Sequence, residues 1–133
     1  MLYLDSSAIV KLVAPEPESP DLVQVISADP EVVSSAVAWT EVVRAVRRAG
    51  GRASRAEEVL GAIALVPIDD GILRGAADLT PKALRTLDAI HLATVLSLGS
   101  DVASLITYDS RLARAASSNH VHVLAPGATR GAW

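Results

Sequence analysis

The sequence contains no cysteine and no phenylalanine among its 133 residues. The absence of cysteine excludes disulfide bonds and thiolate metal sites, and it suits a reducing compartment, so we expect a cytoplasmic protein. The absence of phenylalanine predicts an aliphatic core of valine, leucine, isoleucine and alanine. No apolar run approaches the roughly 18 residues of a membrane span, and the first residues lack the pattern of a signal peptide. We therefore expect neither a membrane span nor a signal peptide.

The residues that are present have the composition of one globular domain. Half of them are hydrophobic and a fifth are charged, and the length suits one core, so we expect a single domain over residues 1–133. The net charge of −3 does not by itself favour binding to nucleic acid. Five arginines nonetheless fall in one short segment with no acid among them, which indicates either a basic stripe or an ordinary solvated helix face. These are Arg44, Arg47, Arg48, Arg52 and Arg55.

Short apolar runs alternate with amphipathic segments along the chain. Strands are expected at residues 2–5, 31–36, 64–68, 104–108 and 121–125, with the third at a sheet edge because it contains Pro67. Helices are expected at residues 6–14, 21–28, 37–50, 54–63, 69–79, 86–99 and 110–117, followed by a loose tail from 126. This alternation predicts an α/β fold with a mainly parallel sheet between helices, whose binding crevice lies at the carboxyl ends of the strands.

Two aspartates stand at the ends of expected strands. Asp5 ends the strand at 2–5, and Asp109 follows the strand at 104–108. If both strands are parallel and central, both carboxylates lie at the same edge of the sheet. Each aspartate also precedes a serine and a helix, so each can equally be a helix N-cap.

Two further acids lie on expected helices. Asp88 shares one side of its helix with Leu84 and Leu92, where an unpaired carboxylate facing the core would be costly. It also lies in the first helical turn, where it can simply complement the helix dipole. Glu41 lies at the margin of an apolar helix face, where it can simply pair with Arg44 on the surface.

Taken together, these four acids predict a metal site. Carboxylates gathered in one crevice would repel each other and raise each other's pKa values unless a cation compensated. Because the sequence has no cysteine and only three histidines, Mg²⁺ is favoured over Zn²⁺, with Mn²⁺ as a possible substitute. One such ion, or two, could activate a water and stabilise the leaving oxygen of a phosphodiester. The predicted site comprises Asp5, Glu41, Asp88 and Asp109.

Four stretches of the sequence resemble the acidic motifs of PIN-domain ribonucleases, and most closely those of the VapC-type toxins: YLDSSAIVKL, SSAVAWTEVVRA, LRTLDAIHLATVLSLG and LITYDSRLARAA. They occur in the family's order over nearly the whole chain. The resemblance implies an α/β/α sandwich with a sheet of four or five mainly parallel strands. It also implies that the four acids are catalytic metal ligands, that Ser6 holds Asp5 or a metal-bound water, and that Thr107 supports the last acid.

The same resemblance implies a function and partners. It implies a Mg²⁺- or Mn²⁺-dependent endoribonuclease toxin that inhibits growth or translation until a VapB-type antitoxin neutralises it. It also implies a homodimer and a hetero-oligomer with that antitoxin. Arg44, Arg48 and Arg85 are expected to contact the RNA backbone, although Arg85 can also be an exposed loop residue. The sequence departs from many relatives at residues 117–120, SSNH, where a glycine is common in a turn.

Two other functions compete with this one. A PIN-fold module that binds RNA or a partner without cutting would gain nothing from four acids that repel phosphate. A phosphoacceptor signalling domain needs a lysine after the last strand, whereas the strand at 121–125 leads to Pro126. Among the remaining side chains, His91 is expected to be a partly buried, hydrogen-bonded support of the site, and Trp39 is expected to belong to the core. His120 and His122 are too few ligands for a metal site.

Overall fold

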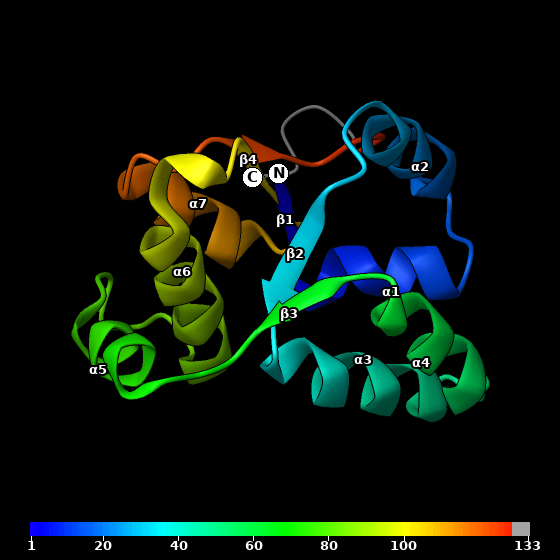
Figure 1. Cartoon of the computed structure of the whole chain (residues 1–133), viewed down its shortest axis with the longest axis horizontal. Coiled ribbons are helices and arrows are strands. Elements are labelled where there is room, and N and C mark those ends of the chain that lie inside the picture. Colours follow the sequence, from blue (N-terminus) through cyan, green and yellow to red (C-terminus); the bar gives the residue numbers. More distant parts are fainter. Residues whose placement is uncertain (129–133) are drawn as a thin grey trace.

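A five-stranded, fully parallel sheet lies between two layers of helices in the computed structural model, which describes residues 1–128 (Figure 1). The strand order is β3-β2-β1-β4-β5, so the first and fourth strands lie side by side at the centre of the sheet. The expected parallel sheet is confirmed, with β3 at an edge. The strands are β1 (Leu2–Leu4), β2 (Val32–Ser35), β3 (Ala64–Val66), β4 (Ser104–Ile106) and β5 (Val123–Leu124).

All seven expected helices are found in this part of the chain. They are α1 (Ser6–Val13), α2 (Ser19–Ala28), α3 (Val37–Arg48), α4 (Ala53–Gly61), α5 (Asp70–Asp78), α6 (Thr86–Leu98) and α7 (Ser110–Ser118). A short 3₁₀ helix at Gly99–Asp101 was not expected. Helix α2 begins two residues earlier than expected, because Pro20 fits a first helical turn, where no backbone N–H donor is needed. None of the helices within residues 1–128 is long and apolar enough to cross a lipid bilayer.

The two faces of the sheet bury two separate cores. Leu2 and Leu4 pack with Ile106 toward α1, α3 and α4, whereas Tyr3 and Leu105 pack toward α6 and α7. Figure 1 shows these two groups of helices on opposite sides of the sheet. Successive strand residues point to opposite faces, so a strand covered on both faces is apolar throughout.

Two expectations about the helices are wrong. Trp39 was expected in the core, but 40% of its surface is exposed, because the inward positions of α3 are Ala38, Val42 and Val46. Helix α6 was expected to have one apolar side, shared by Asp88 with Leu84 and Leu92, but it is buried at seven consecutive positions from Ala89 on. Helix α6 packs against α5, α7 and β2 at once, and this explains why it is apolar all round.

Helices α3 and α7 end in the same backbone motif with different residues. After α3, the N–H of Gly50 donates to the carbonyl oxygen of Arg47 (3.0 Å), and Gly50 has a φ of +79°. After α7, the N–H of His120 donates to the carbonyl oxygen of Ser117 (3.1 Å), and His120 has a φ of +64°. Glycine adopts a positive φ at little cost, but histidine does so only under strain. The strained residue is part of the SSNH stretch.

The segment after β5 is ordered as far as it is described. The hydroxyl of Tyr108 donates to the carbonyl oxygen of Pro126 (2.7 Å). At Gly127 a Cβ atom would lie 2.8 Å from Asp21 Oδ2, so the chain passes close to the start of α2. The expected loose tail is therefore wrong for residues 126–128, and its remaining part lies outside the described residues.

Candidate active site

The adjacent ends of β1 and β4 position two of the four acids. Leu4 pairs with Ile106, and the N–H of Asp5 donates to the carbonyl oxygen of Ile106 (3.2 Å). Both aspartates are also helix N-caps: Asp5 Oδ1 accepts from the N–H of Ala8 (3.1 Å), and Asp109 Oδ1 accepts from that of Leu112 (3.2 Å). The two roles are compatible, because a helix that follows a parallel strand begins at the sheet edge where binding crevices lie.

One cleft of about 390 Å³ at this edge contains all four acids. Asp88 reaches it from the first turn of α6, and Glu41 from the second turn of α3. The structure thus brings together the residues that the sequence predicted to be close, while their roles as ligands and catalysts stay a prediction. The lining residues are Asp5, Ser6, Ser7, Glu41, Arg85, Thr86, Leu87, Asp88, His91 and Asp109.

Asp5 is the most buried of the acids, with 3% of its surface exposed. Its Oδ1 accepts from the Ser7 hydroxyl (2.6 Å), and its Oδ2 accepts from the Thr107 hydroxyl (2.6 Å). Burial raises the pKa of Asp5, although the nearby His91 ring and these hydrogen bonds act in the opposite direction. Ser6 was expected to hold Asp5 or a metal-bound water; its hydroxyl donates to Glu41, and Ser7 bonds Asp5 because successive residues of a helix point 100° apart. The role of Ser6 toward a metal-bound water stays a prediction.

Thr107 connects the first and last acids. Besides donating to Asp5, its hydroxyl oxygen accepts from the backbone N–H of Asp109 (3.0 Å). The expected support of Asp109 by Thr107 therefore acts on the backbone of that residue. One hydroxyl group thus fixes the relative position of two carboxylates that are far apart in the sequence.

A buried chain of hydrogen bonds holds Glu41. Its Oε1 accepts from the Ser6 hydroxyl (2.6 Å) and lies 2.8 Å from His91 Nε2, while His91 Nδ1 lies 2.7 Å from the Tyr3 hydroxyl. An ionised carboxylate can only accept, so Nε2 carries a proton, and a neutral His91 accepts from Tyr3 at Nδ1. Glu41 makes this pair with His91 rather than the expected surface pair with Arg44.

This chain of hydrogen bonds has Glu41 at one end and Tyr3 at the other, and the surroundings of each determine its protonation. Burial raises the pKa of Glu41, but the hydrogen bonds from His91 and from the Ser6 hydroxyl outweigh burial and lower the pKa below its usual value. Burial raises the pKa of Tyr3, so its hydroxyl keeps its proton. His91 is more buried than expected, at 2% exposed. Tyr3 was not expected at the site, because a tyrosine inside an apolar strand has the appearance of a core residue.

Arg85 lies between the third and fourth acids. Its Nε is 3.5 Å from Asp88 Oδ2, and its Nη2 is 3.4 Å from Asp109 Oδ2. The first contact is an ion pair without hydrogen-bond geometry, so Asp88 Oδ2 is buried with no hydrogen-bond partner in the described chain. Burial and the charge of Asp109 raise the pKa of Asp88, against the opposing effect of Arg85.

The acids do not form a ready-made metal cage. Within residues 1–128, no group of three or more acidic or histidine side chains is arranged to hold one metal ion. The donor set still fits a hard divalent cation, because it consists of carboxylate oxygens, one of which has no hydrogen-bond partner. The raised pKa of Asp88 has the same implication, since an added cation would relieve the repulsion from Asp109.

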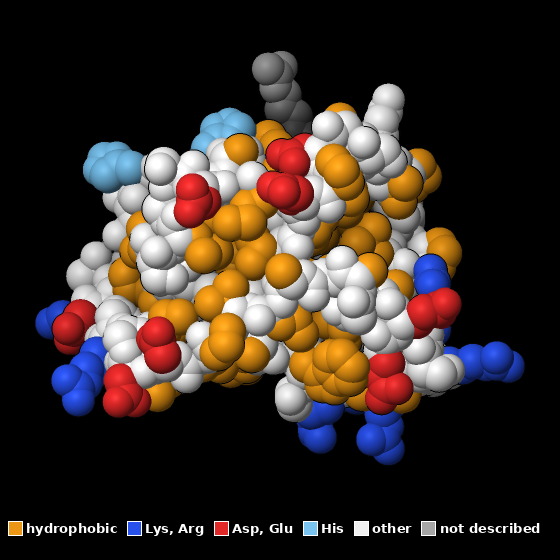
Figure 2. Space-filling model, in the orientation of Figure 1, with side chains coloured by type: hydrophobic (Ala, Val, Ile, Leu, Met, Phe, Trp, Pro, Cys, Tyr) orange, Lys and Arg blue, Asp and Glu red, His pale blue; other side chains and the backbone are white. Residues whose placement is uncertain are grey.

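A second hollow, of about 520 Å³, adjoins the cleft on the side of α3. It shares Ser6, Ser7 and Glu41 with the cleft, and it is bordered by Arg44 and Arg48. Figure 2 shows Lys and Arg side chains projecting from the edge of the molecule where α3 and α4 lie. Two arginines of the predicted stripe are therefore beside the acids.

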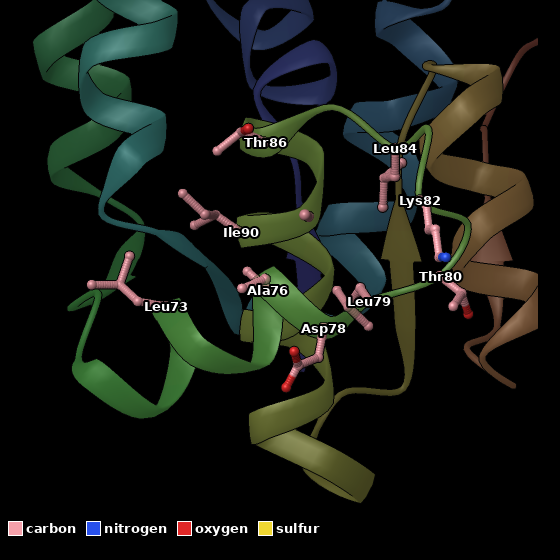
Figure 3. A pocket seen from close by; sticks show the side chains of 11 residues that line it. Leu73, Ala76, Asp78, Leu79, Thr80, Lys82, Leu84, Thr86 and Ile90 are labelled. Carbon is pink, nitrogen blue, oxygen red and sulfur yellow. The ribbon is translucent and has the colours of Figure 1, made fainter.

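The largest hollow lies elsewhere, between α5 and α6. It has a volume of about 650 Å³, and Figure 3 shows it bordered mainly by aliphatic side chains such as Leu73, Leu79 and Ile90. None of the four acids lines it. Its polar lining residues, Asp78, Thr80, Lys82 and Thr86, include a single carboxylate, so the hollow lacks the set of acids that metal chemistry requires.

Comparison with known proteins gives consistent results. The family model of the PIN domain matches residues 2–117. The chain is 46% identical over 126 residues to Ribonuclease VapC46 of Mycobacterium tuberculosis, covering 94% of this chain and 97% of that protein.

Solved structures share the fold at low sequence identity. The crystal structure of Mycobacterium tuberculosis VapC20, a sarcin–ricin loop cleaving toxin, has a TM-score of 0.71 at 14% identity, covering 86% of this chain and 95% of that one. A toxin–antitoxin complex from Klebsiella pneumoniae has a TM-score of 0.68 at 21% identity, covering 84% and 88%.

Proposed function

This chain belongs to the PIN-domain family and within it to the VapC ribonucleases, and from this membership we propose that it is a metal-dependent endoribonuclease, the toxin of a toxin–antitoxin pair. The observation that carries the proposal is the gathering of four carboxylates in one cleft, with a buried Asp88 oxygen that has no hydrogen-bond partner in the described chain. A binder of RNA would gain nothing from such a set, because carboxylates repel phosphate. A hydrolase that uses divalent cations requires one.

Each acid has a separate means of being held in place for this role. Asp5, Glu41, Asp88 and Asp109 would hold one or two Mg²⁺ ions, with Mn²⁺ as a possible substitute. A bound ion supplies the Lewis acidity that activates a water and stabilises charge on the leaving oxygen of the phosphodiester. Ser7 and Thr107 fix Asp5, and Ser6 and His91 fix Glu41.

The RNA backbone is expected to lie against the arginines beside the cleft. Arg44 and Arg48 border the adjoining hollow, and Arg85 lies at the acids themselves. Arginine suits this task because its planar guanidinium binds phosphate oxygens with two hydrogen bonds. Binding through such contacts weakens as the salt concentration rises.

We further propose that a VapB-type antitoxin inhibits this toxin, and that the toxin forms a homodimer and a hetero-oligomer with the antitoxin. The Klebsiella pneumoniae complex, which has the same fold, supports a protein partner of this kind. Free of the antitoxin, the toxin would cut RNA in the cytoplasm and inhibit growth or translation.

The decisive experiment compares aspartates that all lie at the starts of helices: Asp5 and Asp69 are N-caps, and Asp88 lies in the first turn of α6. Asp5→Asn and Asp88→Asn should lower Mg²⁺-dependent cleavage of labelled total RNA by about 1,000-fold, the scale of losing a catalytic group, and EDTA should abolish cleavage by the unsubstituted protein. Asp69→Asn is the matched control, because Asp69 caps α5 through the N–H of Ile72 (2.8 Å) and does not line the cleft.

Asparagine is also a good N-cap at Asp5 and Asp69, and at Asp88 it removes a charge without removing a capping hydrogen bond, so all three variants should fold. Full metal-dependent cleavage by Asp88→Asn would overturn the proposed function. The absence of cleavage by every form, the unsubstituted protein included, would instead favour the catalytically silent PIN-fold module.

A further inference from the structure

A third hollow lies beside α7, on the face of the sheet opposite to α3. It has a volume of about 470 Å³ and lies between α7 and the segment 81–84. Arg111 and Arg114 border it, and no acidic residue is among its lining side chains. We propose that this hollow, here called the α7 hollow, binds the RNA strand beyond the cleavage site, opposite Arg44 and Arg48. This proposal rests on the proposed function.

The two arginines of the α7 hollow are available to a ligand. Both are exposed, and they lie three residues apart, so they share one side of α7. Within residues 1–128 neither forms an ion pair with a carboxylate, and Arg114 has only a long contact with the Ser110 hydroxyl (3.5 Å). By contrast, Arg55 pairs with Glu58 and Arg85 pairs with Asp88.

The remaining lining of the α7 hollow is mainly apolar. Pro81, Leu84 and Ala115 contribute to it. A nucleotide combines an anionic phosphate with a flat base that stacks on apolar or planar groups. Two free guanidinium groups beside an apolar surface therefore match one or two nucleotides.

Residues that line the α7 hollow are directly connected to residues that line the cleft at two points of the chain. Leu84 in the hollow precedes Arg85 in the cleft, and the backbone N–H of Arg111 donates to Asp109 Oδ1 (2.8 Å). Helix α3 packs on one face of the sheet and α7 on the other, so arginines flank the acids from both layers. An RNA strand whose phosphodiester lies at the acids would extend onto both flanks. This continuity favours RNA over an acidic peptide as the occupant.

The test measures RNA binding without cleavage. Asp5→Asn serves as the background, and the probe is a fluorescent single-stranded RNA of about 20 nucleotides, longer than the roughly 4 to 16 nucleotides that a binding domain covers. Adding Arg111→Ala and Arg114→Ala should weaken binding about 10-fold and lower the slope of log Kd against log salt by about 1.4, or 0.7 for each phosphate contact. Fluorescence anisotropy at four salt concentrations gives both values.

The control removes one charge elsewhere. Arg74→Ala on α5 and Arg114→Ala on α7 each remove one exposed arginine, but only Arg114 borders the α7 hollow. Arg74→Ala should leave both the Kd and the salt slope unchanged. Unchanged binding by the double α7 variant would overturn the proposal, as would equal losses in the two single variants.

Two further outcomes distinguish this proposal from its alternatives. If the double α7 variant retains RNA binding but no longer co-purifies with its co-expressed antitoxin, the α7 hollow is a protein-binding surface and the proposal is wrong. If Asp5→Asn and Asp88→Asn abolish cleavage while the double variant binds RNA normally, the proposed function stands and only the α7 hollow fails.

Discussion

At the scale of single residues, Tyr3 and His91 determine how Glu41 is presented to the cleft. Tyr3 is fully buried and His91 is 2% exposed, so neither can exchange its partner for water. The ring edge of one faces the other, with centroids 5.8 Å apart and planes at 85°. A histidine whose second nitrogen is fixed in this way has one favoured tautomer and orientation.

Removing the Tyr3 hydroxyl should leave Glu41 less firmly held without creating a cavity in the core. In Tyr3→Phe the ring stays, but His91 Nδ1 loses the hydroxyl group that donates to it. The Tyr3 hydroxyl then no longer favours the tautomer of His91 that has its proton on Nε2 and donates it to Glu41. We expect Mn²⁺ affinity to fall about 10-fold, the lower end for losing an indirect support of a metal ligand. Titration calorimetry with Mn²⁺ measures this without reference to cleavage.

The other tyrosine provides the control for that experiment. The hydroxyl of Tyr108 bonds to the carbonyl oxygen of Pro126 and not to any of the acids. Tyr108→Phe should lower the free energy of unfolding by about 1 kcal/mol, as for one lost hydrogen bond, and leave Mn²⁺ affinity unchanged. Equal losses of Mn²⁺ affinity in both variants would show that the role assigned to Tyr3 is wrong.

The four acids could be found from the sequence, but their partners could not. Asp5 and Asp109 were visible because each stands between an apolar strand and a helix. Whether Ser6 or Ser7 faces Asp5 depends on how α1 is rotated against the sheet, and the sequence does not contain that angle. Tyr3 was hidden for a related reason, because a buried hydroxyl is recognisable only when its partner is known.

At the scale of elements, proline and glycine made the boundaries predictable. Helix α3 ends at Arg48, just before Gly50 and Gly51, and α5 ends at Asp78, before Pro81, so both ends lie within two residues of the expected ones. The burial of whole elements was harder to predict, because it depends on neighbours that are distant in sequence. Trp39 is 40% exposed because it lies off the inward side of α3, whereas α6 packs against α5, α7 and β2.

The shared ending of α3 and α7 gives a reciprocal test. Gly50→Ala should lower the free energy of unfolding by about 1 kcal/mol, because the backbone at position 50 has a positive φ that alanine adopts only with strain. The added Cβ atom itself has space, since no atom lies within 4 Å of its position. His120→Gly should raise the free energy of unfolding by about 0.5 kcal/mol, because relief of strain exceeds the added flexibility of the unfolded chain. Urea unfolding measures both values, and a loss of stability in His120→Gly would contradict the assigned strain.

At the scale of the whole molecule, the strand order assembles the site from distant parts of the chain. The alternation of strands and helices predicted a parallel sheet, but it did not specify that β1 lies between β2 and β4. The central position of β1 and β4 could only be assumed from the sequence. Because β1 and β4 are central, their carboxyl ends meet and four separate segments contribute to one cleft.

Gathering these charges should make stability depend on pH. Since the pKa of Asp88 is raised in the folded protein, its stabilising contribution is complete below the ordinary aspartate pKa of about 3.9 and is lost as the pH rises through the folded value. Asp88→Asn cannot ionise, so without metal at pH 7 it should melt at a higher Tm than the parent. The difference should vanish below about pH 4.

Calorimetric scans in EDTA between these two pH values test this expectation. Asp69→Asn, at an exposed capping position outside the cleft, should show no such gain. A Tm of Asp88→Asn at or below that of the parent at pH 7 would contradict the repulsion inferred from the raised pKa.

The position of Arg85 has one more consequence. By contacting both Asp88 and Asp109, this side chain acts as a counterion supplied by the protein itself. A divalent ion entering between those carboxylates would therefore displace a tethered monovalent cation instead of filling an empty space. Binding of the divalent ion would then be an exchange for the guanidinium group, with a net gain of one positive charge between Asp88 and Asp109. The displaced guanidinium stays attached beside the ion and within reach of an arriving phosphate.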